Sequence, residues 1–268
     1  MATKRGLCIS RKDLDGIRAR YNGTTALRHT LESIRTHREL VVFFTHFVQF
    51  SLPFSAGAAH LAGTIANASH LFLDAQTTAP TLADRSYEVA RSVFAALEGD
   101  FADHRALAQY FLHELSRYCC GVQSLDGMPA EVDSDTRQSM QHIRDGYGLG
   151  RVLADEELFT AFGFHLGAEL LGDAEFKIID THLRAHRPSL VSHLEQQTTV
   201  INGESHDAYA WISIHAHVEV EHFNKGLAGA HLALKHYAGP HDKLTIRARM
   251  LDGFAAFARM QASAMTRL

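Results

Sequence analysis

The segment YAWISIHAHVEVEHF, residues 209–223, carries the pattern that decides how this chain is organised. On an α-helix each side chain turns by about 100°, so Glu219 lies about 40° from His215, and His222 lies about 20° from it on the other side. The three polar side chains therefore share one narrow face. Apolar side chains flank that face, while the polar residues at 213, 217, 221 and 224 collect on the opposite one.

A carboxylate and two imidazoles in an apolar stripe need compensation, because an unpaired buried ion is strongly unfavourable. A divalent metal supplies that compensation, and the combination of imidazole and carboxylate suits iron, manganese or zinc. The alternative interpretation is a hydrogen-bonded core cluster that holds no metal. We predict that His215, Glu219 and His222 are metal ligands.

Length and charge limit the classes of protein to consider. The chain has 268 residues, which favours one domain over residues 1–268, with residues 1–23 as an N-terminal extension. Its 26 Lys and Arg against 30 Asp and Glu give a net charge of −4, with no strongly basic stretch, so we expect no nucleic-acid partner.

The three cysteines and the apolar runs bear on the cellular compartment. Cys119 and Cys120 are neighbours and Cys8 stands apart, so no disulfide framework is indicated and a cytoplasmic protein is expected. The basic N-terminus leads into a polar stretch, which argues against a secretory signal. The longest apolar window, Leu40–Phe54, is too short and too interrupted to span a bilayer, so we expect no membrane partner.

The periodicity of the chain is helical, and only five prolines interrupt it, so the predicted fold class is all-α. A Gly- and Asp-rich stretch at 121–150 is expected to be irregular, with a short helix near 136–143. Long helices with short connections favour a bundle, whose core is a usual place for a metal site. The predicted helices cover residues 25–51, 54–76, 81–98, 103–120, 154–186, 206–238 and 241–266.

A metal in the bundle core needs ligands from other helices, and the helix predicted at 154–186 offers one. Glu169 is central to a face that is otherwise largely apolar. His165 and Asp173 lie close to it on the same face, either as hydrogen-bonding partners of the ligand or as its replacement.

Upstream, Glu98 and His104 form the next pair of candidates, where one helix ends and another begins. A six-residue spacing would place them about 240° apart on one continuous helix, so joint coordination requires the break that Gly99 indicates. Other interpretations stay open, because Glu98 and Asp100 also fit a solvated helix end. The carboxylates that could substitute for Glu98 are Asp100, Asp103 and Glu88.

These motifs resemble those of the haem-oxygenase-like di-iron oxidases and oxygenases. The similarity covers roughly residues 25–240, and its specific parts are the helix with His215, Glu219 and His222 and the Ala168-Glu169-Leu170 motif. The phrases at 169–176 and 214–219 are most similar to the branch that contains chlamydial-death-protein-like sequences and a nitrile-forming, tryptophan-processing enzyme. Two departures are that Glu219 stands where Asp is commoner and that the spacing from Glu98 to His104 is short.

The resemblance implies a seven-helix haem-oxygenase-like bundle that binds two irons. It also implies an O2-dependent enzyme that oxidises a small substrate through a peroxo-di-iron(III) intermediate, with outcomes such as N-oxygenation, C–C cleavage or nitrile formation. An amino-acid-derived or amine substrate in specialised metabolism is expected. The ligands implied by the resemblance are Glu98, His104, Glu169, His215, Glu219 and His222.

Residues near the predicted metal indicate how a substrate could be held. Trp211 offers an aromatic wall, and Arg105 and Lys225 are candidates to bind a substrate carboxylate. Gly226 and Gly229 continue the face of His215 and leave little side-chain volume, so we expect the substrate to lie there. The sequence does not identify the substrate, whether oxygen enters the product, or whether the chain forms a homodimer.

Two other classes compete with this interpretation. One is a haem-binding or cofactor-free member of the same fold, with an axial histidine from His29, His37 or His46, but haem ligation does not explain a buried Glu219 between two histidines. The other is a non-catalytic metal-binding protein. A thiol nucleophile at the paired cysteines has no evident base partner, so buried small side chains are the simpler interpretation there.

Overall fold

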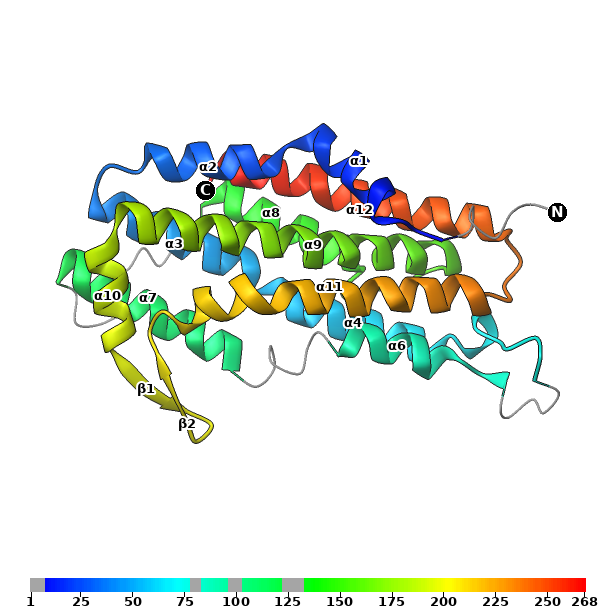
Figure 1. The fold of residues 1–268 in the computed structure, drawn as a ribbon. Coiled ribbons are helices and arrows are strands. Elements are labelled where there is room, and N and C mark those ends of the chain that lie inside the picture. The colour runs from blue at the N-terminus through cyan, green and yellow to red at the C-terminus, as the bar shows by residue number, and fades with distance from the viewer. Residues whose placement is uncertain (1–7, 78–82, 96–102, 122–132) are drawn as a thin grey trace.

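The computed structural model describes residues 8–77, 83–95, 103–121 and 133–268, apart from the side chains of Asp173 and residues 217–220. Helices dominate this part of the chain, which confirms the all-α prediction except for two short strands (Figure 1). The helices are α1 (Arg11–Tyr21), α2 (Gly23–Ser33), α3 (His37–Ser51), α4 (Pro53–Asn67), α6 (Ser86–Phe94), α7 (Arg105–Cys120), α8 (Ser134–Tyr147), α9 (Asp155–His186), α10 (Pro188–Gln196), α11 (Ala210–His236) and α12 (Lys243–Met265).

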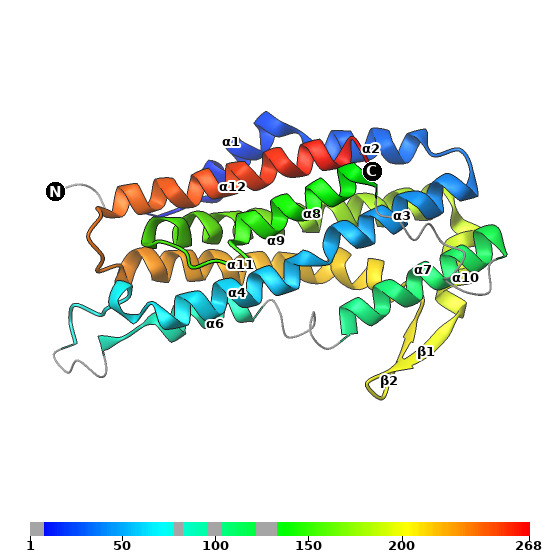
Figure 2. The same cartoon turned by 180° about the vertical axis from the view of Figure 1, so that it is seen from behind.

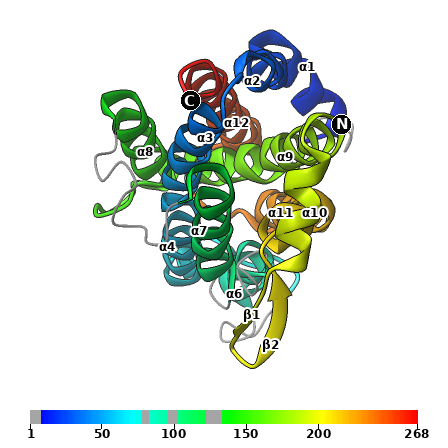
Figure 3. The same cartoon turned by 90° about the vertical axis from the view of Figure 1, so that its left-hand side faces the viewer.

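The centre of the bundle is α9, a helix of 32 residues with α11 and α12 packed along it (Figure 3). The prediction at 154–186 is confirmed almost to the residue. Glycines bring α9 and α12 together: a Cβ on Gly163 would lie 1.7 Å from the Met250 carbonyl oxygen, and one on Gly253 would lie 1.9 Å from that of Thr160. The two backbones are therefore in direct contact, which fixes α9 in the middle of the core.

The first predicted helix, 25–51, is two helices. Thr36 ends the connection between α2 and α3, because its hydroxyl accepts from the Glu39 amide while the Glu39 carboxylate accepts from the Thr36 amide. This capping box starts a new helix at His37. Residues 11–21 of the expected N-terminal extension form α1, which packs along α12 and buries Leu14 completely.

The helices α3 and α4 follow almost one line along the bundle (Figure 2). The stretch 37–67 is the one helical segment, among the residues described, that is long and apolar enough to cross a membrane, and 56% of the tested window is buried inside the protein. Its phenylalanines explain the apolarity, because Phe43, Phe44 and Phe47 are each at most 1% exposed in the protein core. The predicted helix 54–76 is shorter than expected and ends at Asn67.

Residues 188–207 do not fit the sequence prediction. Pro188 starts α10, and a hairpin of β1 (Thr198–Ile201) and β2 (Glu204–Asp207) projects from the bundle (Figure 1). Asn202 and Gly203 take φ values of 51° and 89° in its turn, as a two-residue hairpin turn requires. The helix predicted at 206–238 accordingly begins only at Ala210. The helix predicted near 136–143 is longer than expected and forms α8.

Candidate functional site

A cavity of about 310 Å³ lies in the bundle between α3, α4, α7, α8, α9, α11 and α12. Apolar and aromatic side chains supply most of its wall. Six of the residues predicted for the site also line it: His104, Arg105, Glu169, Trp211, His215 and His222. They come from α9, from α11 and from the start of α7, so the structure brings together residues that lie far apart in sequence.

The ring of His215 is held by a hydrogen bond to the backbone of its own helix. Its Nδ1 lies 2.7 Å from the carbonyl oxygen of Trp211, one turn earlier on α11. Because a carbonyl oxygen can only accept, Nδ1 donates and carries the proton, which leaves Nε2 of the neutral ring as the atom that can bind a cation. Phe176 stacks on the ring at 4.3 Å between centroids, and the residue is only 8% exposed.

His104 meets His215 from another helix. The two ring centroids are 4.4 Å apart. His104 lies immediately before α7, in a π-helical turn at residues 103–104, a local distortion that is frequent at functional sites. Two imidazoles this close repel each other once both are protonated, so a shared cation or neutral rings are the stable arrangements.

Glu169 lies between two histidines. Its Oε1 is 3.5 Å from Nδ1 of His165, and its Oε2 is 3.7 Å from Nδ1 of His222. His165 is completely buried, and its Nδ1 also lies 3.2 Å from the hydroxyl of Tyr147 on α8. His165 therefore lies beside Glu169, one turn earlier on the same face of α9. The carboxylate bridges α9 and α11 at the wall of the cavity.

Three predicted residues cannot be placed in this geometry. Glu98 lies outside the described residues, as does the break expected at Gly99. The backbone of Glu219 belongs to α11, one turn after His215, but its side chain is outside the described part, and the same holds for Asp173 on α9. The structure thus describes the side chains of four of the six predicted ligands.

A different group has the closest donor atoms. Among the described residues, Asp103, Glu204 and His206 form the group of three whose possible ligand atoms all lie within 4.8 Å of one another. We call it the hairpin cluster, because two members belong to β2. The four predicted ligands that line the cavity, His104, Glu169, His215 and His222, do not form such a group. Ligands of a two-metal centre need not all be mutual neighbours, since its metals are themselves about 3.5–4 Å apart.

Other predicted positions lie away from the cavity. Lys225 pairs with Glu221 at 2.9 Å on a largely exposed face of α11 and does not line the described cavity. The expectation that substrate lies over two glycines of α11 is wrong. A Cβ on Gly229 would lie 1.7 Å from the Ser92 hydroxyl, and one on Gly226 would lie 3.2 Å from Leu166, so both glycines serve helix packing.

Tyr147 and Glu175 are among the polar residues of the cavity wall that were not predicted. Glu175 on α9 is 5% exposed, and Gln261 of α12 donates a hydrogen bond from Nε2 to its Oε1 at 2.5 Å. Burial raises the pKa of Glu175 to about 8, against the opposing effect of that hydrogen bond. In a sequence, a single glutamate in a long helix resembles a solvated residue, and only the packing of α12 reveals its burial.

The competing interpretations find less support in the geometry. His29 and His37 are exposed, and His46 pairs with Asp133 at 2.9 Å, and none of the three lines the cavity described above. Burial raises the pKa of Cys119 to about 12, so its thiol stays protonated at neutral pH and is a poor nucleophile.

Comparisons with protein-family models, with curated proteins and with solved structures find no match to this chain. The arguments for function therefore come from the residues of the cavity.

Proposed function

We propose that this protein is a non-haem di-iron, O2-dependent oxidase or oxygenase that acts on a small amino-acid-derived or amine substrate. The observation that carries the proposal is the convergence of His104, Glu169, His215 and His222 on one cavity. The resemblance to haem-oxygenase-like di-iron enzymes, with their seven-helix bundle, supports it, and Glu98 and Glu219 complete the proposed ligand set.

The donor chemistry fits iron. Three imidazoles and one carboxylate are borderline and hard donors of the kind found at non-haem iron centres. The hydrogen bond from His215 to the Trp211 carbonyl fixes the ring in the tautomer that binds metal through Nε2. Tyr147 fixes His165, which in turn lies beside Glu169. Hydrogen-bonding partners of this kind orient metal ligands in other proteins.

Iron bound here would supply the activation of O2, and the residues of the chain would control the surroundings. Phe176 and Trp211 cover His215 and restrict water around it. Arg105 lies at the cavity wall with its side chain exposed, where it could bind the carboxylate of an incoming substrate. A cavity of this size fits a small molecule.

Reconstitution of the full chain with Fe(II) under argon, followed by exposure to O2, tests the proposal. We expect a visible absorption band that depends on both iron and O2, and O2 consumption that rises with one member of a panel of amino acids and amines. Absence of any iron-dependent O2 reaction would overturn the proposal.

Variants locate the reaction in the cavity. His104→Ala removes a proposed ligand and is expected to abolish O2 consumption. The control is Glu195→Ala on α10, which removes an exposed ion pair with Arg184 of α9 and is expected to react like the wild type. Equal loss in both variants would show that the reaction does not depend on the cavity.

Non-catalytic metal binding is the second candidate function, and the hairpin cluster favours it. A protein of this kind would bind a divalent ion through Asp103, Glu204 and His206 and would not consume O2. Glu204→Ala separates the two functions, because it should abolish metal binding only if the hairpin cluster is the principal site.

A further inference from the structure

The face of α9 that lines the cavity carries two carboxyl groups. Glu169 and Glu175 are separated by six residues, which corresponds to about 9 Å along the helix axis and about 120° around it. Gly172 lies between them on the same wall, and a Cβ added there would meet nothing within 4 Å. The missing side chain leaves an open path along the wall from one carboxyl group to the other.

The surroundings of the two carboxyl groups differ. Glu169 lies among imidazoles, whereas the described partner of Glu175 is the neutral amide of Gln261, which is 1% exposed. Among the residues that the structure describes, no Lys, Arg or His forms an ion pair with Glu175. Gln261 donates to one carboxyl oxygen of Glu175, and the residue lines the cavity.

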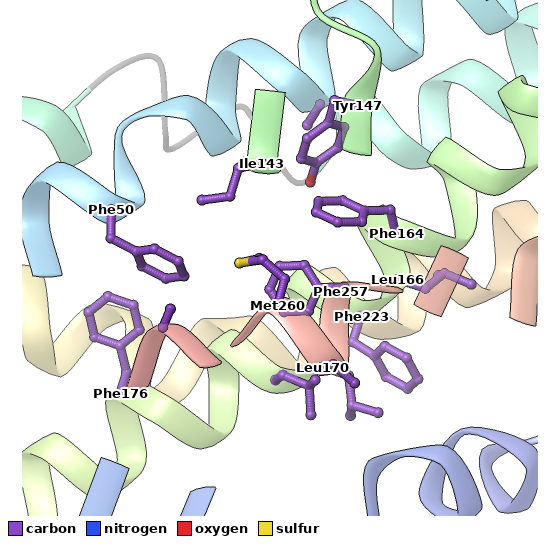
Figure 4. Close-up of a cluster of buried hydrophobic side chains, with 14 of the residues drawn as sticks. Phe50, Ile143, Tyr147, Phe164, Leu166, Leu170, Phe176, Phe223, Phe257 and Met260 are labelled. Atoms are coloured by element: carbon purple, nitrogen blue, oxygen red, sulfur yellow. The ribbon is translucent and has the colours of Figure 1, made fainter. Parts of the chain in front are cut away.

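Aromatic side chains line the same cavity as Glu175. Phe50, Phe176 and Phe257 line the cavity, and Figure 4 shows them turned toward the same space from α3, α9 and α12. Phe54 adds a further ring, 5.5 Å from Phe50 between centroids. A carboxyl group in such surroundings is costly to the fold unless a bound group compensates it, and its raised pKa reflects that cost.

We infer that Glu175 and its aromatic wall bind the ammonium group of a primary amine that carries a short aryl or alkyl chain. The ammonium donates to the second oxygen of Glu175, and the chain lies along Gly172 among the phenylalanines. That this amine is the substrate rests on the proposed function. The hydrocarbon chain of the bound amine would then extend toward His104, Glu169, His215 and His222. The binding site itself needs no metal.

Trp211 provides the measurement. It is the only tryptophan of the chain, and it lines the cavity, so its fluorescence reports on binding there. The metal-free full chain is titrated with 2-phenylethylamine, with 2-phenylethanol as the neutral match and with 3-phenylpropanoate as the anionic one. We expect the amine to bind at least tenfold more tightly than the alcohol and the anion to bind more weakly than both.

Glu175→Gln keeps the size of the side chain and removes its charge. We expect it to reduce amine affinity at least tenfold and to leave alcohol affinity unchanged, with wild-type circular dichroism as the check on folding. Gly172→Leu fills the path along α9 and should abolish the binding of both ligands, which distinguishes the cavity from the surface.

The inference is wrong if amine and alcohol bind equally, if Glu175→Gln binds the amine like the wild type, or if the amine does not bind at millimolar concentration. These outcomes are independent of the proposed function. If the protein binds the amine but no iron, the amine site stands and the di-iron proposal is wrong. If the protein binds iron but does not prefer the amine, the di-iron proposal stands and the amine site is wrong.

Discussion

The cavity and the hairpin cluster both bring histidine and carboxylate side chains together, but they do so in different surroundings. In the hairpin cluster the donor atoms are close, Glu204 is exposed, and Asn202 donates to Asp103 at 2.6 Å. In the cavity the donors are further apart, and His215 is buried with its ring fixed by a backbone carbonyl. The distances between donor atoms alone favour the hairpin cluster as a metal site. Burial and ring orientation favour the cavity.

The comparison shows that side chains whose burial is energetically costly are stronger evidence for a bound ion than side chains that are merely close together. The exposed carboxylate of Glu204 is stabilised by water and needs no ligand. Imidazoles and a carboxylate held in an apolar core are costly without a compensating ion. The cavity therefore has the stronger reason to contain a metal, although its side chains are less tightly gathered.

The largest expected effect concerns iron binding. Glu169→Ala removes the carboxylate between His165 and His222 and is expected to abolish stable iron loading. Glu204→Ala, the matched change in the hairpin cluster, should bind as much iron as the wild type. Metal analysis after anaerobic Fe(II) loading and desalting measures both. If Glu169→Ala bound iron normally and Glu204→Ala did not, the hairpin cluster and not the cavity would be the iron site.

The next effect concerns the pH dependence of stability. The pKa of Glu175 in the folded protein is about 8, above its ordinary value, so the folded state retains this proton as pH rises. The wild type should then lose stability between about pH 4.5 and pH 8 relative to Glu175→Gln, by roughly 3–5 kcal/mol in the free energy of unfolding. Urea denaturation at pH 5, 7 and 9 measures the difference.

The control for this experiment is Glu204→Gln in the hairpin, whose carboxylate is exposed. It should show no comparable change in stability with pH. A pH-independent difference between wild type and Glu175→Gln would mean that Glu175 is ionised normally in the folded protein.

A smaller effect is expected from the hydrogen bond between Tyr147 and His165. Tyr147→Phe leaves the ring in place and removes the hydroxyl, so His165 and its neighbour Glu169 are less firmly oriented. We expect iron affinity to fall roughly tenfold, as for other partners of metal ligands. Tyr118→Phe on α7 removes a more exposed hydroxyl and should leave the affinity unchanged, and equal effects of the two variants would remove Tyr147 from the site.

The smallest expected effect is on stability, and it has opposite signs for a glycine of the cavity wall and a glycine of the hairpin turn. Gly172 is in a helix with open space around its missing Cβ, so Gly172→Ala should stabilise the protein by about 0.5–1 kcal/mol. Gly203 has a φ of 89° in the hairpin turn, so Gly203→Ala should destabilise it by about 1 kcal/mol. Thermal denaturation of both variants tests this, and a destabilised Gly172→Ala would mean that the cavity beside α9 is already filled.

Periodicity predicted the parts of the fold that are long and amphipathic. The bounds of α9 and the shared face of His215 and His222 on α11 follow from the 3.6-residue repeat, and both residues line the cavity. That Glu169 faces the same cavity could also be predicted, because it is central to an otherwise apolar face. The position of His104 beside His215 depends on where α7 begins, which a repeat does not define.

Other features of the fold have local sequence signals that are independent of the 3.6-residue repeat. The Thr36 and Glu39 capping box marks the break between α2 and α3, and Asn202-Gly203 is a typical hairpin turn. Glu175 had no such signal. Its burial depends on Gln261 in α12, and a contact between residues 86 positions apart is set by tertiary packing.

The most direct test is to titrate Fe(II) under argon into the Glu204→Ala variant, which lacks the hairpin cluster, and to monitor the fluorescence of Trp211. Trp211 lies 5.9 Å from His215 between ring centroids, so iron at this site should quench its emission strongly. We predict that quenching reaches its end point at two irons per chain. An unchanged emission, or an end point well below two irons per chain, would contradict a di-iron centre in the cavity.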